Sequence, residues 1–389
     1  PTGEGEGEAS VDPVAPTRVA SLTKTVELPD LNETARAATL PADELEGPKR
    51  DEDATETGSL PVELHPPVPA DWRTAQTAST PAPLVGTGLG LFGLREPPFV
   101  NRSRECELVW SALHAAVEQR TPQIVFVTGE AGTGKSRLAE WMATRAHEVG
   151  AAQVVRAVHT SGGGASDGLR GALEETLRTL KMDRGAVFEH LRASLPPLEE
   201  GDADWGERDA RALTEYLRPT DEEADEVDGP RYQFASADQK RALLVRTLRR
   251  LASRRPVLLW IDDLQWGREA LGLVEYLHQR ADRPAGLLVL ATLRSDIVAE
   301  RDRLGERIDA LAEAETSMTL PLEPLSRVHQ RTLLMELLPL EDQLADRLAE
   351  RTEGHPLFAM QLLGHWIEEN TIEMGPEGFR VPEGHELDV

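Results

Sequence analysis

The feature that most constrains the fold is the run at residues 129–136, Gly-Glu-Ala-Gly-Thr-Gly-Lys-Ser. It fits the pattern G-x-x-x-x-G-K-[ST], in which glycines let the backbone turn tightly and aim its N–H groups inward. An apolar run without alternation, 124–127, precedes it, and a helix-forming stretch, 137–143, follows it. A strand, a loop and a helix in this order predict a cradle for phosphate groups, because the positive end of the helix dipole faces the loop. The alternative is a glycine-rich turn that holds no ligand.

Each position of this loop has an expected role. Lys135 should reach the β- and γ-phosphates of a bound nucleotide, and the Ser136 hydroxyl should ligate Mg²⁺. The expected phosphate-binding residues are Gly129, Glu130, Ala131, Gly132, Thr133, Gly134, Lys135, Ser136 and Arg137.

A second motif supplies further oxygen ligands. The apolar run Val257–Ile261 is followed directly by Asp262 and Asp263. Mg²⁺ needs more oxygen ligands than one serine provides. If this strand is the parallel neighbour of 124–127, both acids lie beside the phosphate loop. We therefore expect Asp262 to bind the metal and Asp263 to orient the attacking water, since phosphoryl transfer depends on positioning. The alternative is that two acids merely end a strand.

Apolar runs and helical periods alternate along the chain after residue 98, which predicts an α/β fold with a doubly wound parallel sheet. The expected strands are 124–127, 153–158, 257–261, 287–291 and 318–320. Residues 326–370 are expected to be helical throughout. A small hairpin is expected over 373–381.

The first 95 residues differ in composition from the rest. They hold 16 acidic and 7 basic residues, and about half of the chain's 27 prolines occur by Pro98. The segment shows no sustained helical or strand period. Such a segment cannot bury enough surface to offset its chain entropy. We expect 1–95 to be a disordered acidic linker or an untethered tail. The core is then expected over 96–325, with an acidic insertion at about 196–229, and a separate C-terminal part over 326–389.

Composition excludes several classes of protein. The single cysteine, Cys106, excludes an intramolecular disulfide framework and a cysteine-based zinc site. The formal net charge of -26 makes the chain a poor general binder of nucleic acids or anionic membranes. No apolar run approaches the roughly 18 residues of a membrane span. We expect a cytoplasmic protein.

The combination of GEAGTGKS with WIDDLQW at 260–266 resembles the STAND-type P-loop ATPases, which are signal-transducing relatives of AAA+ proteins. In large bacterial regulators this domain is often called origin-recognition-like AAA, and some of these regulators carry serine/threonine kinase or adenylate cyclase modules. The resemblance covers about Phe99 to the end of the chain. It implies that the ligands are ATP or ADP with Mg²⁺, and that covalently linked domains lie upstream and downstream. It also implies that 326–389 hold a helical lid and the start of a truncated following domain. Oligomerisation stays open.

Three further site residues follow from this resemblance. The family carries a pattern like F-V-G-R-E before its first strand, and the run Phe99-Val-Asn-Arg-Ser-Arg-Glu departs from it at Asn101 and Ser103 while keeping Arg102. Arg102 is implied to lie near the base and ribose. Arg294 matches an arginine that senses the γ-phosphate, and Pro356 matches a G-x-P signature whose proline lies near the base. The alternatives are a surface arginine for Arg102, a surface ion pair for Arg294 and a helix start signal for Pro356.

The resulting hypothesis is an ATP-binding, slowly hydrolysing switch module of a multidomain signalling protein. One alternative is a scaffold that holds nucleotide without turning it over. A DNA-bound initiator-like ATPase is a third reading, against which the negative charge argues. The chain contains neither the H-R-D nor the D-F-G motif of protein kinases, so any kinase activity would belong to another domain.

Overall fold

The computed structural model describes residues 68–73, 98–163, 168–195, 203–220, 231–279 and 284–382. All of them fall in one compact unit, Pro61–Val389. Most of the predicted acidic linker, residues 1–67 and 74–95, lies outside the described residues, as does much of the acidic insertion at 196–229.

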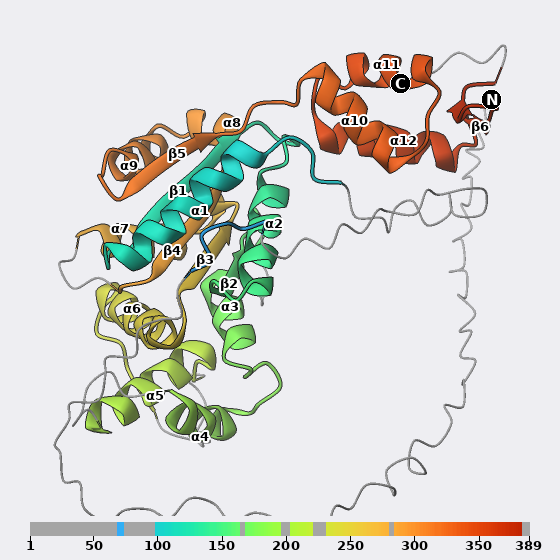
Figure 1. Cartoon of the computed structure of the whole chain (residues 1–389). Helices are drawn as coiled ribbons and strands as arrows, with labels where there is room; N and C mark the ends of the chain where they lie inside the picture. Colours follow the sequence, from blue (N-terminus) through green and yellow to red (C-terminus); the bar gives the residue numbers. More distant parts are fainter. Residues whose placement is uncertain are drawn as a thin grey trace, which may run out of the picture. The chain divides into compact units, whose positions relative to one another are not determined.

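Five strands form a parallel sheet in the order β2-β3-β4-β1-β5, which confirms the predicted α/β class (Figure 1). The strands are β1 Gln123–Gly129, β2 Gln153–Val158, β3 Val257–Asp262, β4 Leu287–Arg294 and β5 Ser317–Pro321. All five predicted strands are present. The expected direct pairing of β3 with β1 is wrong, because β4 lies between them and pairs with both.

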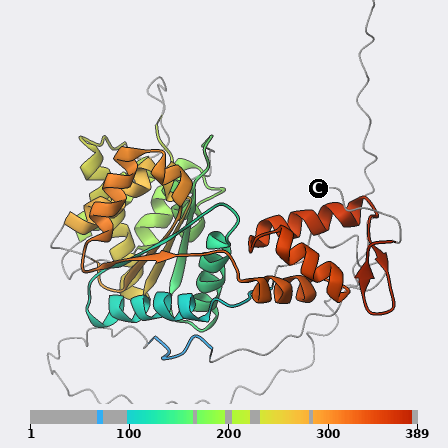
Figure 2. The same ribbon diagram turned by 90° about the horizontal axis from the view of Figure 1, so that it is seen from above.

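The central strands are buried on both faces, which explains why their sequences do not alternate between apolar and polar residues. Val125 and Leu290 belong to the apolar cluster under helices α1 (Ser103–Glu118) and α2 (Lys135–Glu148). Phe126 and Val289 belong to the cluster on the opposite face. Figure 2 shows the cyan helix α1 across the sheet from the yellow and orange helices.

The opposite face is covered by helices from the middle of the chain. They are α3 Gly168–Thr176, α4 Arg184–Ser194, α5 Ala203–Leu217, α6 Ala237–Arg254, α7 Arg268–Gln279 and α9 Asp302–Ala312. Two short helices follow the strands that carry Asp262 and Arg294: the 3-10 turn η2 Leu264–Trp266 and α8 Ser295–Ala299. Both sit at the carboxyl edge of the sheet, where ligands of open α/β sheets bind.

The C-terminal part contains three helices with their own apolar core. They are α10 Arg327–Leu337, α11 Asp342–Arg351 and α12 Pro356–Glu368. Leu334, Leu348 and Leu363 are fully buried among them. The expectation of continuous helix over 326–370 is corrected by breaks at 338–341 and 352–355. The predicted hairpin is present as β6 Glu373–Met374 and β7 Phe379–Arg380.

Six residues of the predicted linker, 68–73, have a defined place in the fold. Val68 and Trp72 are 8% and 6% exposed and belong to the apolar cluster of α1 and α2. Here the structure differs from the expected disorder, because one tryptophan and one valine bury enough apolar surface to hold a short segment without periodicity.

Within the described ranges, no helix combines the length and the apolar character that crossing a membrane requires.

The single cysteine should be chemically silent while the chain is folded. The Cys106 side chain is 0% exposed on α1, and burial raises its thiol pKa to about 12. Because the thiolate is the nucleophile, iodoacetamide at pH 8 should leave the folded chain unmodified and add one adduct after denaturation. Intact-mass spectrometry measures this. An adduct that forms equally fast on the folded chain would contradict the packing of α1.

Candidate functional site

The loop between β1 and α2 takes a conformation that depends on glycine. Gly132 and Gly134 have φ of 81° and 97°, and Gly129 has φ of 155°. A Cβ at Gly129 would lie 2.6 Å from the Leu322 carbonyl oxygen. Gly134 is the N-cap of α2, so the first N–H groups of that helix open toward the loop.

Lys135 is the first residue of α2 and is only 6% exposed. Its Nζ donates to the Glu130 carbonyl oxygen at 2.5 Å, and the Thr133 hydroxyl donates to the same oxygen at 3.0 Å. Burial lowers the pKa of Lys135, while the nearby Asp263 carboxylate acts in the opposite direction. The ammonium group is therefore held inside the loop, where an anionic ligand would favour its charged form.

Ser136 and Asp262 meet at the end of the sheet. The Ser136 hydroxyl donates to Asp262 Oδ1 at 2.8 Å, and the Thr292 hydroxyl donates to the same oxygen at 2.7 Å. Thr292 belongs to β4, the strand that lies between β1 and β3 in the sheet.

This pair of oxygens fits a magnesium ion in its donor chemistry. A serine hydroxyl and a buried carboxylate are hard oxygen donors of the kind that Mg²⁺ takes together with water and phosphate oxygens. In the part of the chain that the structure describes, no group of three or more His, Cys, Asp or Glu side chains could hold a metal ion. A metal at Ser136 and Asp262 would thus need further oxygens from a ligand or from water.

Asp263 has a left-handed backbone, with φ of 56°. Its N–H donates to the Thr292 hydroxyl at 2.9 Å, and its carboxylate accepts from Gln265 Nε2 at 2.8 Å. Asp262 therefore contacts Ser136, whereas Asp263 lines the adjacent cavity. Neither Thr292 nor Gln265 was identified from the sequence, because only their place in the fold brings them to the two acids.

Arg294 ends β4 directly opposite Gly129 of β1. Its guanidinium also lines the cavity, but it forms an ion pair with Asp296 at 2.5 Å. The hydrogen bond to Asp296 raises the pKa of Arg294. The ion pair considered as an alternative from the sequence is thus present, and the arginine still borders the cavity.

These side chains surround a cavity of about 320 Å³. The sequence-predicted residues in its wall are Arg102, Ala131, Gly132, Thr133, Gly134, Lys135, Ser136, Arg137, Asp263, Arg294 and Pro356. Gly129, Glu130 and Asp262 do not line it. Seven apolar lining residues were not predicted from the sequence: Pro98, Phe99, Val100, Leu325, Leu333, Leu357 and Met360. The cavity lining therefore has a polar part, formed by the loop and by charged side chains, and an apolar part, formed by residues before α1, before α10 and within α10 and α12.

Arg102 links the loop to the segment that leads into α10. Its guanidinium donates to the Glu323 carbonyl at 2.7 Å and to the Thr133 carbonyl at 3.4 Å, and it pairs with Glu105 at 3.1 Å. It is therefore more than a solvated surface arginine. Asn101, which departs from the family pattern, contacts His329 Nδ1 at 2.9 Å through its amide.

Helix α12 contacts the phosphate loop at its first turn. The Leu357 N–H donates to the Gly132 carbonyl at 3.4 Å, and His355 Nε2 lies 3.3 Å from a Glu130 carboxylate oxygen. Pro356 begins the helix, as the helix-start interpretation of Gly-His-Pro requires, and it also lines the cavity. The helices α10–α12 thus reach the site through contacts with the loop itself.

Comparison with known families agrees with this geometry. Residues 98–290 match the family described as "AAA ATPase domain". This segment is similar to AAA ATPase domains. Curated proteins give no match to the chain.

Several solved structures are similar to the chain at low identity. A Walker-type ATPase of Pyrococcus abyssi is 13% identical with a TM-score of 0.40, and the alignment covers 72% of each chain. Cdc6p from Pyrobaculum aerophilum is 14% identical with a TM-score of 0.44, covering 74% of this chain and 68% of that one. A STAND protein with a tetratricopeptide repeat sensor from Pyrococcus horikoshii is 18% identical with a TM-score of 0.34, covering 71% of this chain and 32% of that one.

The close approach at Gly129 predicts a large effect of a single methyl group. Gly129→Ala should lower the free energy of unfolding by roughly 2–4 kcal/mol, since the new Cβ adds a clash with the Leu322 carbonyl to the backbone strain. Gly150→Ala is the matched control, because Gly150 also has positive φ but nothing lies within 4 Å of the Cβ that the substitution would add. It should cost only the strain, about 1–2 kcal/mol. Urea unfolding measures both, and equal losses would argue against the clash.

Proposed function

We propose that this chain binds ATP with Mg²⁺ and hydrolyses it slowly, as a nucleotide-controlled switch within a larger cytoplasmic signalling protein. The observation that carries the proposal is the hydrogen bond between Ser136 and Asp262 at 2.8 Å, next to the buried Lys135. It brings the two expected metal ligands together beside a loop whose N–H groups and ammonium group suit phosphates.

The shape of the cavity supports a nucleotide rather than a bare phosphate. The α2 N-terminus and Lys135 would hold the phosphate chain at the polar part of the lining. Phe99, Pro356 and Leu357 would contact the base at the apolar part. Mg²⁺ would be held by Ser136 and Asp262 and would offset the negative charge of the phosphates.

Two contacts favour slow hydrolysis. Asp263 is the residue proposed to orient water, and its carboxylate already accepts from Gln265. Arg294 is proposed to stabilise charge on the transferred phosphoryl group, and it is already paired with Asp296. Each side chain therefore already has one partner that competes with its proposed role. The same contacts favour the second candidate function, a nucleotide-bound scaffold without turnover.

The switch would act through α10–α12. Their contacts with the loop, from Leu357 to Gly132 and from His355 to Glu130, join the helices to the atoms that would surround the phosphates. A ligand that changes the loop would shift the balance between joined and released helices. The net charge of -26 disfavours the DNA-bound initiator reading.

Binding is tested at Lys135. Lys135→Met should weaken MgATP binding by roughly 10- to 100-fold, the range of a lost charged hydrogen bond. Lys181→Met is the matched control on an exposed turn and should bind as the wild type does. Isothermal titration calorimetry measures both, and undiminished binding by Lys135→Met would contradict the proposal.

The same lysine sets a pH dependence. Burial lowers the Lys135 pKa in the free chain, and phosphate charge would raise it again on binding. The affinity for MgATP should therefore fall as the pH rises from that lowered pKa toward the usual value of 10.5. In Lys135→Met, the affinity for MgATP should fall less steeply with rising pH.

Turnover is tested at Asp263. Asp263→Asn should reduce phosphate release by roughly 100-fold or more, the range of a lost general base, while the affinity for MgATP stays within a few-fold. Gln265 can still donate to the asparagine oxygen, so the local fold should persist. If the wild-type chain binds MgATP but releases no phosphate, the scaffold function replaces the hydrolytic one.

A further inference from the structure

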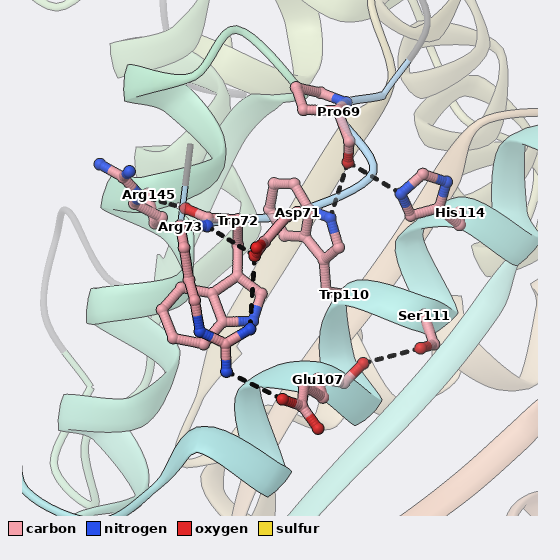
Figure 3. A network of polar contacts seen from close by, with 9 residues as sticks. All are labelled: Pro69, Asp71, Trp72, Arg73, Glu107, Trp110, Ser111, His114 and Arg145. Atoms are coloured by element: carbon pink, nitrogen blue, oxygen red, sulfur yellow. Dashed lines mark hydrogen bonds and ion pairs between the residues drawn. The ribbon is translucent and has the colours of Figure 1, made fainter. Parts of the chain in front are cut away.

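Residues 68–73, here called the strap, lie across α1 and α2, outside the residues that match the AAA family (Figure 3). The contacts on α1 come from Glu107, Trp110 and His114, which share one helix face at i, i+3 and i+7. Those on α2 come from Trp141 and Arg145, at i and i+4.

The strap is held through its own backbone. The Pro69 carbonyl accepts from the Trp110 indole N–H at 2.9 Å and from His114 Nε2 at 2.9 Å. The Trp72 carbonyl accepts from Arg145 Nε at 2.6 Å, and Arg145 is only 7% exposed. The buried donors of Trp110 and Arg145 would lose these partners if the strap moved away. Because an unpaired buried donor costs free energy, these contacts favour one position of the strap.

A series of aromatic rings connects the strap to the cavity. The Trp72 ring meets Trp141 edge-on with centroids 5.0 Å apart, and Trp141 stacks on Phe99 at 4.7 Å with an interplanar angle of 6°. Phe99 belongs to the apolar part of the cavity lining. Arg73 covers the outer side of Trp72 at 4.0 Å and pairs with Glu107 at 2.8 Å.

We infer that Trp72 is a positioning residue for the base of the bound nucleotide and that the docked strap couples the N-terminal segment to nucleotide affinity. Trp72 fixes Trp141, and Trp141 fixes Phe99 before the ligand arrives. Ordering Phe99 in advance removes an entropy cost that binding would otherwise bear. By thermodynamic reciprocity, a bound nucleotide must also hold the strap more firmly. This inference rests on the proposed nucleotide binding.

The test separates the base from the phosphates. In the full chain, Trp72→Ala should weaken MgATP binding by roughly 2- to 10-fold, the range for one immobilised side chain. Magnesium tripolyphosphate has no base and should bind the variant and the wild type equally. Trp72→Phe should restore ATP affinity, because the Trp72 indole N–H has no hydrogen-bond partner in the described structure and phenylalanine keeps a ring against Trp141.

A measurement on the wild-type chain needs no variant to fold. Hydrogen–deuterium exchange at the backbone amides of 68–73 should slow when MgATP is added and should not slow with magnesium tripolyphosphate. Unchanged exchange with saturating MgATP would overturn the coupling.

The remaining outcomes are also distinct. If Trp72→Ala lowers thermal stability but leaves MgATP affinity unchanged, the strap is a structural brace and the inference is wrong. If Trp72→Ala loses affinity for MgATP and for magnesium tripolyphosphate to the same degree, Trp72 acts on the phosphate loop and not on the base. If the wild-type chain binds neither ligand, the proposed function fails, and the inference fails with it.

Discussion

The hydrogen bond from Ser136 to Asp262 joins two segments that are 126 residues apart, and the architecture of the site depends on it. It can form only if α2 begins next to the carboxyl end of β3. Asp262 ends β3, whereas Ser136 lies on α2, which follows β1 and the phosphate loop. The sheet order places β4 between β3 and β1. Thr292 on the intervening strand holds Asp262 with its hydroxyl and receives the N–H of Asp263. One side chain on β4 thus contacts the carboxylate of Asp262 and the backbone of Asp263.

The lining of the cavity beside this contact has two chemically different parts, and they come from different segments of the chain. Within the polar part, the loop is local, since loop and helix α2 are continuous and Lys135 bonds to the carbonyl of Glu130 only five residues before it. The apolar part is assembled from Phe99, from the segment before α10 and from the first turn of α12. This division explains why a ligand with a charged tail and an apolar ring suits the cavity better than either part alone.

Two side chains with proposed roles in hydrolysis already have other partners in the structure. Asp263 and Arg294 border the cavity, yet Gln265 and Asp296 already satisfy them. In the proposed hydrolysis, weakening either contact would add to the barrier of the chemical step.

Short-range pattern was enough to predict the strands, the loop and the acids at the end of β3. Each depends on a few adjacent residues: an apolar run, a spacing of glycines, or two carboxylates after a strand. The sequence could not reveal that β4 separates β1 from β3, since strand order is decided by long-range packing. Thr292, Gln265 and the apolar lining have ordinary identities and became recognisable only from their positions. The strap shows the same limit most clearly. A tryptophan in an acidic, proline-rich stretch carries no period, and only the tertiary structure decides that α1 and α2 offer it buried partners, because burial is a property of the surfaces that meet.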